Sequence, residues 1–392
     1  MRSQASPVIE SPRRVAVLVD TSTTWGRGII NGIHQYSRRH GNWHLFVEAR
    51  GLEDSSPLPA GWQGDGIIAR IGSPEQAAQL RRRRIPVVNV SGIRLPGRAF
   101  PCVCNDSEAA ARMAVDYFLE RGFRNFAYLS LRGLEYVARQ CEAYQAAVSA
   151  AGCSCSVRGV EVQSGFIAPD WNLHEGELGR WLASLPKPVA VLAWGGGREV
   201  VRACLRAGLR VPQEVAVLSS SDDTLLSGIS PVPISGVRNA CGRIGQEAAA
   251  LLDRAMCGDS VGGTDMRIAP LGVVTRQSTD TLAIADGAVV SAVAFIREHL
   301  GGKIRVAEVA RVAGISRSGL ERRFAEHLGT SPAAFLIRAR LDRVRELLAE
   351  TDMPVAEISE KCGFGAPEYM TAMFRREYAV TPLRYRKEAR SR

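Results

Sequence analysis

Hydrophobic and polar positions follow two different patterns along this chain. Over residues 14–280, short apolar runs alternate with segments whose apolar residues recur every three or four positions. Arg14–Asp20 (RVAVLVD) and Pro188–Ala193 (PVAVLA) are runs typical of buried strands, whereas Ile29, Ile33 and Tyr36 share one helical face. Strands that are apolar throughout and alternate with helices predict parallel sheets covered by helices on both faces.

The same reading predicts enough strand–helix units for two α/β lobes. Besides the two runs above, strands are expected at 43–49, 66–69, 85–90, 125–130, 157–162, 214–218, 267–270 and 273–277. Helices are expected at 73–84, 107–121, 137–151, 172–184, 198–207 and 242–256. A polar turn, TSTTWGRG, is expected after the first strand.

From Val306 onward only the helical period remains. Val306–Phe324 reads as a helix, a corner at Gly314 and a second helix capped by Ser316, which is the layout of a helix-turn-helix. Val355–Phe374 repeats the plan, with Gly363 at the corner. In this second unit the apolar side of the second helix is assigned to three residues: Tyr369, Met373 and Phe374.

A long helix is expected between the two units, at Pro332–Glu350. Its apolar stripe consists of Ile337, Leu341, Val344 and Leu348. Such a helix can hold both second helices on one face of DNA, in major grooves about 34 Å apart. The residues expected to face the DNA are Arg317, Ser318, Glu321 and Arg322 in the first unit, and Ala366, Glu368, Thr371 and Arg375 in the second.

Charge supports a nucleic-acid partner without identifying it. The chain carries 50 Lys and Arg against 40 Asp and Glu, a net charge of +10. From Val289 onward there are 19 basic and 13 acidic residues, so the surplus is concentrated at this end. A basic domain is attracted to the phosphate backbone.

Cysteine usage points away from metal, disulfide and enzyme chemistry. The nine cysteines include two C-x-C pairs, Cys102/Cys104 and Cys153/Cys155, whose spacing differs from the C-x-x-C of common zinc and thioredoxin-like sites. Cys141 and Cys204 fall inside expected helices, the wrong setting for a nucleophile. We therefore expect no catalytic residue, metal or cofactor, and reduced thiols in a cytoplasmic protein.

The sequence shows neither the pattern of a signal peptide nor that of a membrane-spanning segment. Residues 1–13 are expected to be a disordered leader, since they are polar and contain Ser and Pro instead of a signal peptide's apolar core. No apolar run reaches the roughly 18 residues that a membrane span needs.

The paired helix-turn-helix units resemble the DNA-binding domain of the AraC/XylS family of bacterial transcription regulators. The resemblance includes the closing Thr381-Pro382-Leu383-Arg384-Tyr385-Arg386 and implies an all-α DNA-binding domain at 289–392. Upstream, Leu205–Asp223 (LRAGLRVPQEVAVLSSSDD) resembles LacI/GalR effector domains, which have a type I periplasmic-binding fold. That implies a two-lobed effector domain at 14–280 and a linker at 281–288.

This order of domains resembles XylR-type regulators. The resemblance implies a homodimeric activator of sugar-catabolism genes that binds double-stranded DNA and a sugar such as xylose, with RNA polymerase as partner. The alternative is a repressor or a ligand-independent regulator whose lobes only dimerise.

Ligands of such folds bind at the carboxyl ends of strands and between lobes. On that basis the expected effector site contains Asp20, Trp25, Asn89, Trp194, Asp222 and Asp223. Carboxylates and amides suit vicinal hydroxyls, and the tryptophans suit the apolar face of a sugar.

Two positions depart from the family pattern. The resemblance places an acid at or beside Trp194 and an arginine at Gln140, next to which Arg139 is a substitute candidate. Both departures affect hydroxyl recognition, so the sugar itself is left open.

Overall fold

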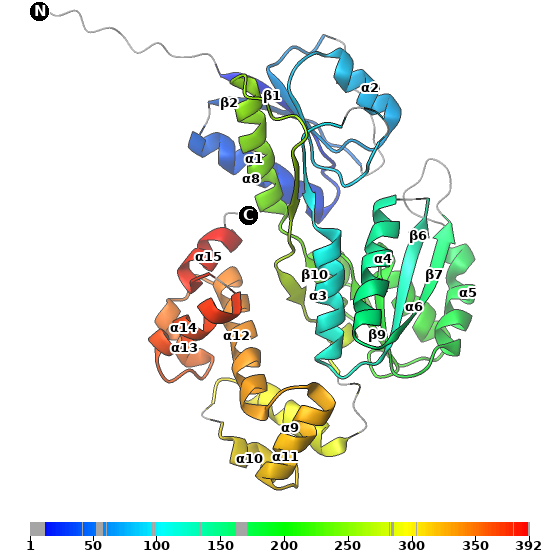
Figure 1. Cartoon of the computed structure of the whole chain (residues 1–392), viewed down its shortest axis with the longest axis vertical. Coiled ribbons are helices and arrows are strands. Elements are labelled where there is room, and N and C mark those ends of the chain that lie inside the picture. Colours follow the sequence, from blue (N-terminus) through cyan, green and yellow to red (C-terminus); the bar gives the residue numbers. More distant parts are fainter. Residues whose placement is uncertain are drawn as a thin grey trace, which may run out of the picture.

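The computed structural model describes most of the chain as two α/β lobes followed by a helical C-terminal domain (Figure 1). The described residues are 12–40, 42–51, 58–59, 61–95, 97, 99–133, 135–161, 171–281, 283, 286–302, 304–378 and 380–390. The expected leader at 1–13 therefore lies almost wholly outside them. None of the helices in this described part combines the length and hydrophobicity that crossing a membrane requires.

The first lobe is built on a six-stranded sheet in the order β11-β5-β4-β3-β1-β2, with every pairing parallel. Its strands are β1 (Arg13–Leu18), β2 (Trp43–Val47), β3 (Gly66–Ala69), β4 (Val87–Asn89), β5 (Cys102–Asn105) and β11 (Asp265–Ile268). Val15 and Val17 pack against α1 (Thr24–His40) and α8 (Cys241–Met256), while Ala16 and Leu18 pack against α2 (Pro74–Arg82). Alternate residues of a strand point to opposite faces, so both faces are buried.

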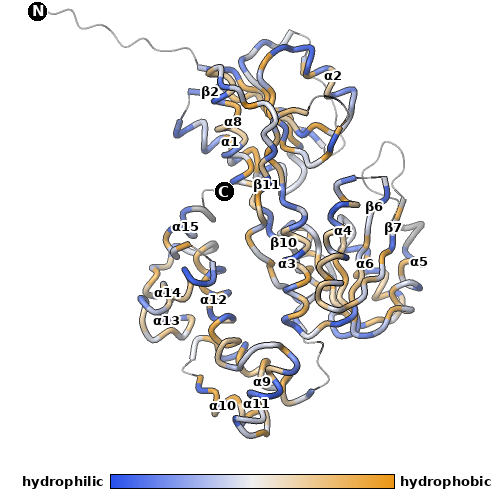
Figure 2. The backbone as a smooth tube through the Cα atoms, viewed as in Figure 1, coloured by the Kyte–Doolittle hydropathy of each residue, from blue (hydrophilic) through white to orange (hydrophobic). Residues whose placement is uncertain are grey.

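The second lobe has a sheet in the order β12-β10-β9-β8-β6-β7, in which β12 alone runs antiparallel to its neighbour among these described strands. Its strands are β6 (Asn125–Arg132), β7 (Ser154–Glu161), β8 (Val189–Ala193), β9 (Val215–Ser219), β10 (Ser235–Arg238) and β12 (Gly272–Val274). Helices α3 (Ser107–Leu119) and α4 (Glu135–Ala150) cover one face, and α5 (Trp171–Ser184) and α6 (Gly197–Arg206) the other. The central strands of both lobes are largely hydrophobic, as Figure 2 shows.

The chain passes between the lobes three times within the described residues. It leaves the first sheet after β5 to enter α3, returns after β10 to enter α8, and leaves again between β11 and β12. We call these three crossings the hinge, and β5 and β11 each end at one of them.

The C-terminal domain has two cores joined by one long helix. Its helices are α9 (Gly287–Glu298), α10 (Val306–Val312), α11 (Arg317–Leu328), α12 (Pro332–Glu350), α13 (Val355–Lys361), α14 (Pro367–Tyr378) and α15 (Pro382–Arg390). Leu336 of α12 belongs to the core around α10 and α11, whereas Leu341, Val344 and Leu348 belong to the core around α13 and α14. The bridging helix has the predicted bounds and lies between the two units in Figure 1.

Both helix corners are built on glycine, as the sequence predicts. Gly314 and Gly363 adopt φ of +69° and +72°. After Gly363 the amide of Phe364 donates to the Ser359 carbonyl, and after Gly314 the amide of Ile315 donates to the Ala310 carbonyl. These are Schellman motifs, which satisfy helix-end carbonyls and require a left-handed residue at the corner.

Several element predictions are corrected by the fold. The turn expected at 21–28 is replaced from Thr24 on by α1, whose start is stabilised by Asp20: its Oδ1 accepts from the Thr23 amide. Strand β5 was not predicted because its four residues carry too short a pattern, and α7 (Thr224–Gly228), α9 and α15 were likewise missed. In α14 the buried residues are Met370 and Phe374, whereas Tyr369 is 49% exposed.

Helix α9 begins within the predicted linker. The Asp286 carboxylate accepts from the amides of Ala288 and Val289, which places the cap of α9 at residue 286. Leu282, Ile284 and Ala285 of that linker lie outside the described residues.

Candidate functional site

The first candidate site is the exposed face of α11. Ser316 caps this helix by accepting a hydrogen bond from the Gly319 amide, and Leu320 and Phe324 bury the opposite face. The expected DNA-facing residues Arg317, Ser318, Glu321 and Arg322 are all exposed. The Arg317 guanidinium donates to Glu321 at 3.0 Å in the absence of DNA, a pair that solvent makes weak and easily exchanged.

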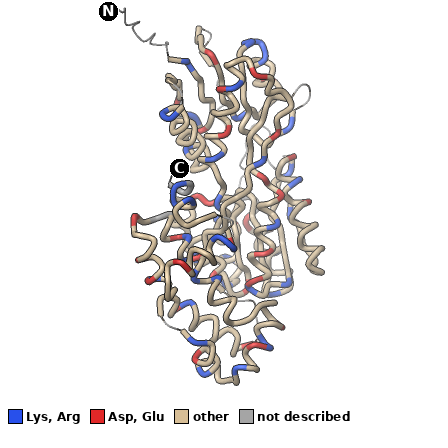
Figure 3. Tube along the Cα trace, turned by 60° about the vertical axis from the view of Figure 1, so that its left-hand side comes forward, with Lys and Arg blue, Asp and Glu red and all other residues tan. Residues whose placement is uncertain are grey.

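The second face lies on α14. Glu368, Thr371 and Arg375 line a shallow hollow together with Pro367, Ala372, Arg376 and Thr381. Ala366 is half-buried and lies directly before α14. Figure 3 shows basic and acidic residues interspersed over the whole molecule. The candidate DNA-binding surface is therefore identified by the paired helices α11 and α14, and not by the distribution of charge.

Replacing Arg317 with alanine is expected to weaken operator binding by about 1–3 kcal/mol, because a forked arginine–guanine contact discriminates bases by that amount. Binding to random DNA of equal length should fall much less. Both affinities are measured by fluorescence anisotropy at one salt concentration. Arg311→Ala removes an exposed arginine of α10, outside the proposed base-reading helix, and is the control for loss of positive charge, which should lower both affinities alike. Equal losses for Arg317→Ala on both DNAs would contradict base reading.

The third candidate site is a pocket of about 640 Å³ between the two lobes. Thr23, Thr24 and Trp25 of the first lobe line it, and Trp194 and Asp222 line it from the second lobe. The loops after β1, β8 and β9 thus meet there, as expected where the carboxyl ends of parallel strands face one another.

Aromatic rings form one wall of this pocket. Trp194 packs edge-on against Tyr136 of α4, with ring centroids 5.4 Å apart. Burial raises the pKa of the Tyr136 hydroxyl, and the nearby Arg70 of the first lobe opposes that rise. The indole Nε1 of Trp25 is buried and has no hydrogen-bond partner among the residues that the structure describes. An indole N–H normally finds a partner when buried, so this donor is available to a ligand.

Two further buried oxygens near the pocket have no partner in the described part of the chain. They are Oδ2 of Asp20 and Oδ1 of Asn105. Asp20 is 4% exposed and uses its other oxygen to accept from the amide and hydroxyl of Thr23, whereas Asn105 lines the pocket itself. Unpaired buried acceptors are costly in a folded protein, so a ligand with hydroxyl donors suits them.

Asn89 and Arg139 hold the loop around residues 91–92 instead of lining the pocket. The Asn89 side chain bonds the backbone of Ile71 and Ser91. Arg139 of α4 donates to the Gly92 carbonyl at 2.7 Å and so ties the second lobe to the first. Both residues therefore act on the shape of the site.

The two adjacent aspartates differ in role. Oδ1 of Asp222 accepts from Arg276 at 2.7 Å, and the two side chains are only 9% and 16% exposed. Asp223 caps α7 by accepting from the Leu226 amide. Both line the pocket, but each carboxylate already has a protein partner.

The structure adds pocket residues that the sequence reasoning missed. They are Arg70, Ser91, Asn105, Tyr136, Gln140, Arg198, Glu199 and Arg238, among others. Asn105 is the last residue of the unpredicted strand β5, so recognising that strand would have selected it by the rule that ligands bind at the carboxyl ends of strands. Gln140, where an arginine was expected, accepts from the buried Tyr128 hydroxyl at 2.9 Å.

The effector lobes touch the C-terminal domain through α3 and α12. Glu120, which follows α3, pairs with Arg338 of α12 at 2.6 Å, and Arg338 also reaches Glu377 of α14 at 3.5 Å. Burial raises the pKa of Glu120, and Arg338 counteracts it. Arg345 of α12 donates to the Val273 carbonyl of β12. The other end of α3 lies at the pocket, where Ser107 and Ala110 are part of the lining.

Two lobes with a pocket between them, joined to paired helix-turn-helix units, define a ligand-binding DNA-binding transcription regulator. Comparison with known families divides the chain accordingly. Residues 14–105 match the XylR N-terminal domain, 115–279 a periplasmic binding protein-like domain and 309–388 a helix-turn-helix domain. The chain is thus a XylR-like transcription regulator, which is not a class of enzyme.

Full-length relatives support this assignment. The chain is 28% identical over 383 residues to the xylose operon regulatory protein of Escherichia coli K12, covering 95% of this chain and 96% of that protein. The solved structure of the xylose-binding transcription activator xylR matches with a TM-score of 0.60 at 27% identity, over 96% of this chain and 98% of that one. A LacI family regulator from Mycobacterium smegmatis shares the fold over 69% of this chain and 99% of its own, with a TM-score of 0.55 and 19% identity.

Proposed function

We propose that the protein is a sugar-responsive transcription activator whose effector binds in the pocket between the lobes. The carrying observation is that, within the described residues, the buried atoms Trp25 Nε1 and Asn105 Oδ1 of the pocket lining have no protein partner, and neither has Oδ2 of Asp20, which lies behind the lining residue Thr23. Two acceptors and one donor suit a ligand rich in hydroxyl groups, because each hydroxyl both donates and accepts.

The aromatic wall supports a sugar over an ion or a fully polar ligand. Trp194 and Tyr136 offer apolar ring surface beside the polar atoms of the first lobe. A sugar ring has polar hydroxyl edges and apolar C–H faces, which matches a pocket with both kinds of wall.

Xylose is the first effector to test, since the relatives are named for the xylose operon. Trp194 and Gln140 replace the expected acid and arginine, and Gln140 is already engaged by Tyr128. Each replacement removes a charged group that would hydrogen-bond the hydroxyl groups of a sugar. We therefore propose a sugar preference different from xylose, for a ligand that presents more apolar surface to Trp194.

The contacts of α3 suggest how the effector state reaches DNA. This helix starts at the pocket and is followed by Glu120, which pairs with Arg338 on the helix that carries both recognition units. We propose that closure of the lobes on the effector moves α3 and shifts α12, so that α11 and α14 fit successive major grooves of the operator.

The assembly and the place of action are further parts of the proposal. We propose a cytoplasmic homodimer on a two-part operator, with RNA polymerase as partner when it activates. The residues named above on α11 and α14 are the proposed DNA contacts.

The test is a thermal-shift screen of the full-length protein against pentoses, hexoses and polyols, followed by operator binding with each hit. A ligand at 100 times its Kd should stabilise the folded protein by about 2.7 kcal/mol. By linkage, the effector must change operator affinity by the factor by which operator changes effector affinity, typically 5–150-fold. A ligand-independent regulator would bind operator but show no stabilisation by any sugar, and a repressor would lose operator affinity on binding the sugar.

Trp25→Phe and Trp194→Phe are expected to weaken effector binding by roughly 1 kcal/mol or more, because each removes the indole N–H and reduces the aromatic surface that a ligand can contact. Calorimetric titration of the screened effector measures the loss. Trp181→Phe is the control, since Trp181 packs in the second lobe away from the pocket lining and bonds Ser156. Unchanged affinity in both pocket variants would show that other residues bind the effector.

A further inference from the structure

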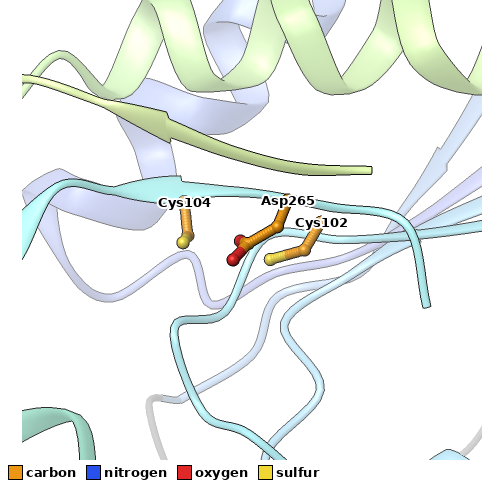
Figure 4. A group of neighbouring side chains, drawn as sticks. All are labelled: Cys102, Cys104 and Asp265. Atoms are coloured by element: carbon orange, nitrogen blue, oxygen red, sulfur yellow. The ribbon is translucent and has the colours of Figure 1, made fainter. Parts of the chain in front are cut away.

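The parallel pairing of β5 with β11 brings together residues about 160 positions apart. Cys102 is opposite Asp265, and Cys104 is opposite Arg267. Residues two apart on a strand share a face, so both thiols and the Asp265 carboxylate lie on the same side of the sheet. Figure 4 shows all three side chains pointing away from the strand pair to one side, with the carboxylate drawn between the two sulfurs.

The three groups are close enough to share one ion. One Sγ from each cysteine and one carboxylate oxygen of Asp265 all lie within 4.8 Å of one another. Zinc bonds of about 2.3 Å to sulfur and 2.0–2.2 Å to oxygen imply ligand separations of roughly 3.5–3.8 Å, which modest side-chain rotations reach. Cys104 is 7% exposed, whereas Asp265 is exposed, so water has access to a fourth position.

The donor set selects the kind of metal. Two thiolates favour a soft or borderline ion such as Zn²⁺ over Mg²⁺ or Ca²⁺, and one carboxylate completes a three-ligand tetrahedral site. The Cys102 thiol donates to the Ser91 carbonyl at 3.3 Å, a hydrogen bond that is given up when the thiolate binds metal. Metal binding would release the protons of both thiols, because the ligating form of cysteine is the thiolate.

Neighbouring arginines compete for Asp265 without closing the site. Arg267 and Arg94 lie 3.5 and 3.7 Å from the same oxygen, Oδ2. Both ion pairs are solvent-exposed and therefore weak, and Arg267 has a second partner in Glu108 at 3.1 Å.

We propose that Cys102, Cys104 and Asp265 form a binding site for a thiophilic divalent metal ion of the zinc type. Binding joins β5 to β11 immediately before both strands cross to the second lobe, and Cys104 is next to the pocket residue Asn105. The ion thus acts on two of the three described hinge crossings, as a second input besides the effector.

The chain contains a matched control for this proposal. Cys153 and Cys155 have the same C-x-C spacing and are both partly exposed. Within the described residues they belong to no group of three potential ligands. The variants to compare are C102S/C104S, C153S/C155S and D265N.

The reduced, chelator-stripped full-length protein is titrated with Zn²⁺ against a chromophoric chelator and with Co²⁺ by absorbance. The parent and C153S/C155S should each bind one ion per chain, with thiolate-to-cobalt charge-transfer bands, while C102S/C104S should bind none. D265N should bind at least about tenfold more weakly, since loss of even an outer-shell partner costs 10–100-fold. No binding by the parent, or equal binding by C102S/C104S, would overturn the proposal.

A measurement on the parent alone covers the case in which C102S/C104S does not fold. Thiol alkylation is followed residue by residue by peptide mass spectrometry, with and without Zn²⁺. The ion should protect Cys102 and Cys104 and leave the rates at Cys153 and Cys155 unchanged. Equal labelling of Cys102 and Cys104 with and without Zn²⁺ would contradict the site.

Discussion

Replacing Arg276 with alanine is expected to destabilise the second lobe by about 3–5 kcal/mol, because it leaves a buried carboxylate without its cation. Arg276 donates to Asp222 at 2.7 Å and to the Ile234 carbonyl at 2.8 Å. The pair holds the segment after β12 against the loop after β9, which lines the effector pocket. Urea or thermal unfolding of the full-length protein measures the loss.

Two variants make this prediction specific. Arg210→Ala removes an arginine from an exposed pair with Glu214 and should change the free energy of unfolding by no more than about 1 kcal/mol. The double variant D222N/R276A removes the buried charge as well and should recover part of the stability, which a double-mutant cycle quantifies. If Arg276→Ala is no more destabilising than Arg210→Ala, the pair is not holding the lobe together.

Gly363→Ala is expected to destabilise the C-terminal domain by about 2–4 kcal/mol, because backbone strain and overpacking add. Gly363 has φ of +72°, where a side chain is strained whatever the space. An added Cβ would also lie 2.6 Å from the Leu300 carbonyl oxygen and 2.7 Å from an Arg340 nitrogen. The carbonyl is backbone and cannot rotate away as a side chain does.

Gly314→Ala separates the two contributions. Gly314 has nearly the same φ, +69°, but nothing lies within 4 Å of an added Cβ. Its loss should be limited to the roughly 1–2 kcal/mol of a left-handed residue. Thermal melting midpoints of the two full-length variants measure both losses of stability. Operator binding by each variant is measured alongside. If Gly363→Ala and Gly314→Ala lose the same stability, the α9–α10 connection and α12 must move away from the added Cβ of residue 363 at little cost in free energy.

The effector pocket explains why a family resemblance does not settle the ligand. The scaffold of two lobes needs only apolar strands and helices, whereas specificity depends on a few polar atoms. In this chain Trp194 and Gln140 stand where charged groups were expected, and Tyr136 packs on Trp194. The proposed ligand preference therefore rests on one aromatic wall and on atoms of Trp25 and Asn105 that have no partner among the described residues.

Much of this protein was determined by local patterns in the sequence. The repeated glycine corners, the Ser316 cap and the apolar stripe of Pro332–Glu350 predicted paired helix-turn-helix units, and the structure confirms them. Apolar strands alternating with helices predicted the two α/β lobes. These features were readable because capping, the left-handed corner and helical or strand period act within a few residues.

Only the tertiary structure decided which distant residues meet. Strand β5 was not predicted because four residues carry little periodicity. As a result, the sequence did not indicate Asn105 as a pocket residue, nor the strand pairing that places Asp265 beside Cys102 and Cys104. The sequence alone gives Asp222 no partner, whereas in the structure the guanidinium of Arg276, 54 residues later, donates a hydrogen bond to its carboxylate. Such contacts depend on sheet register and lobe docking, where burial of many side chains together selects the partner, and no local spacing records that choice.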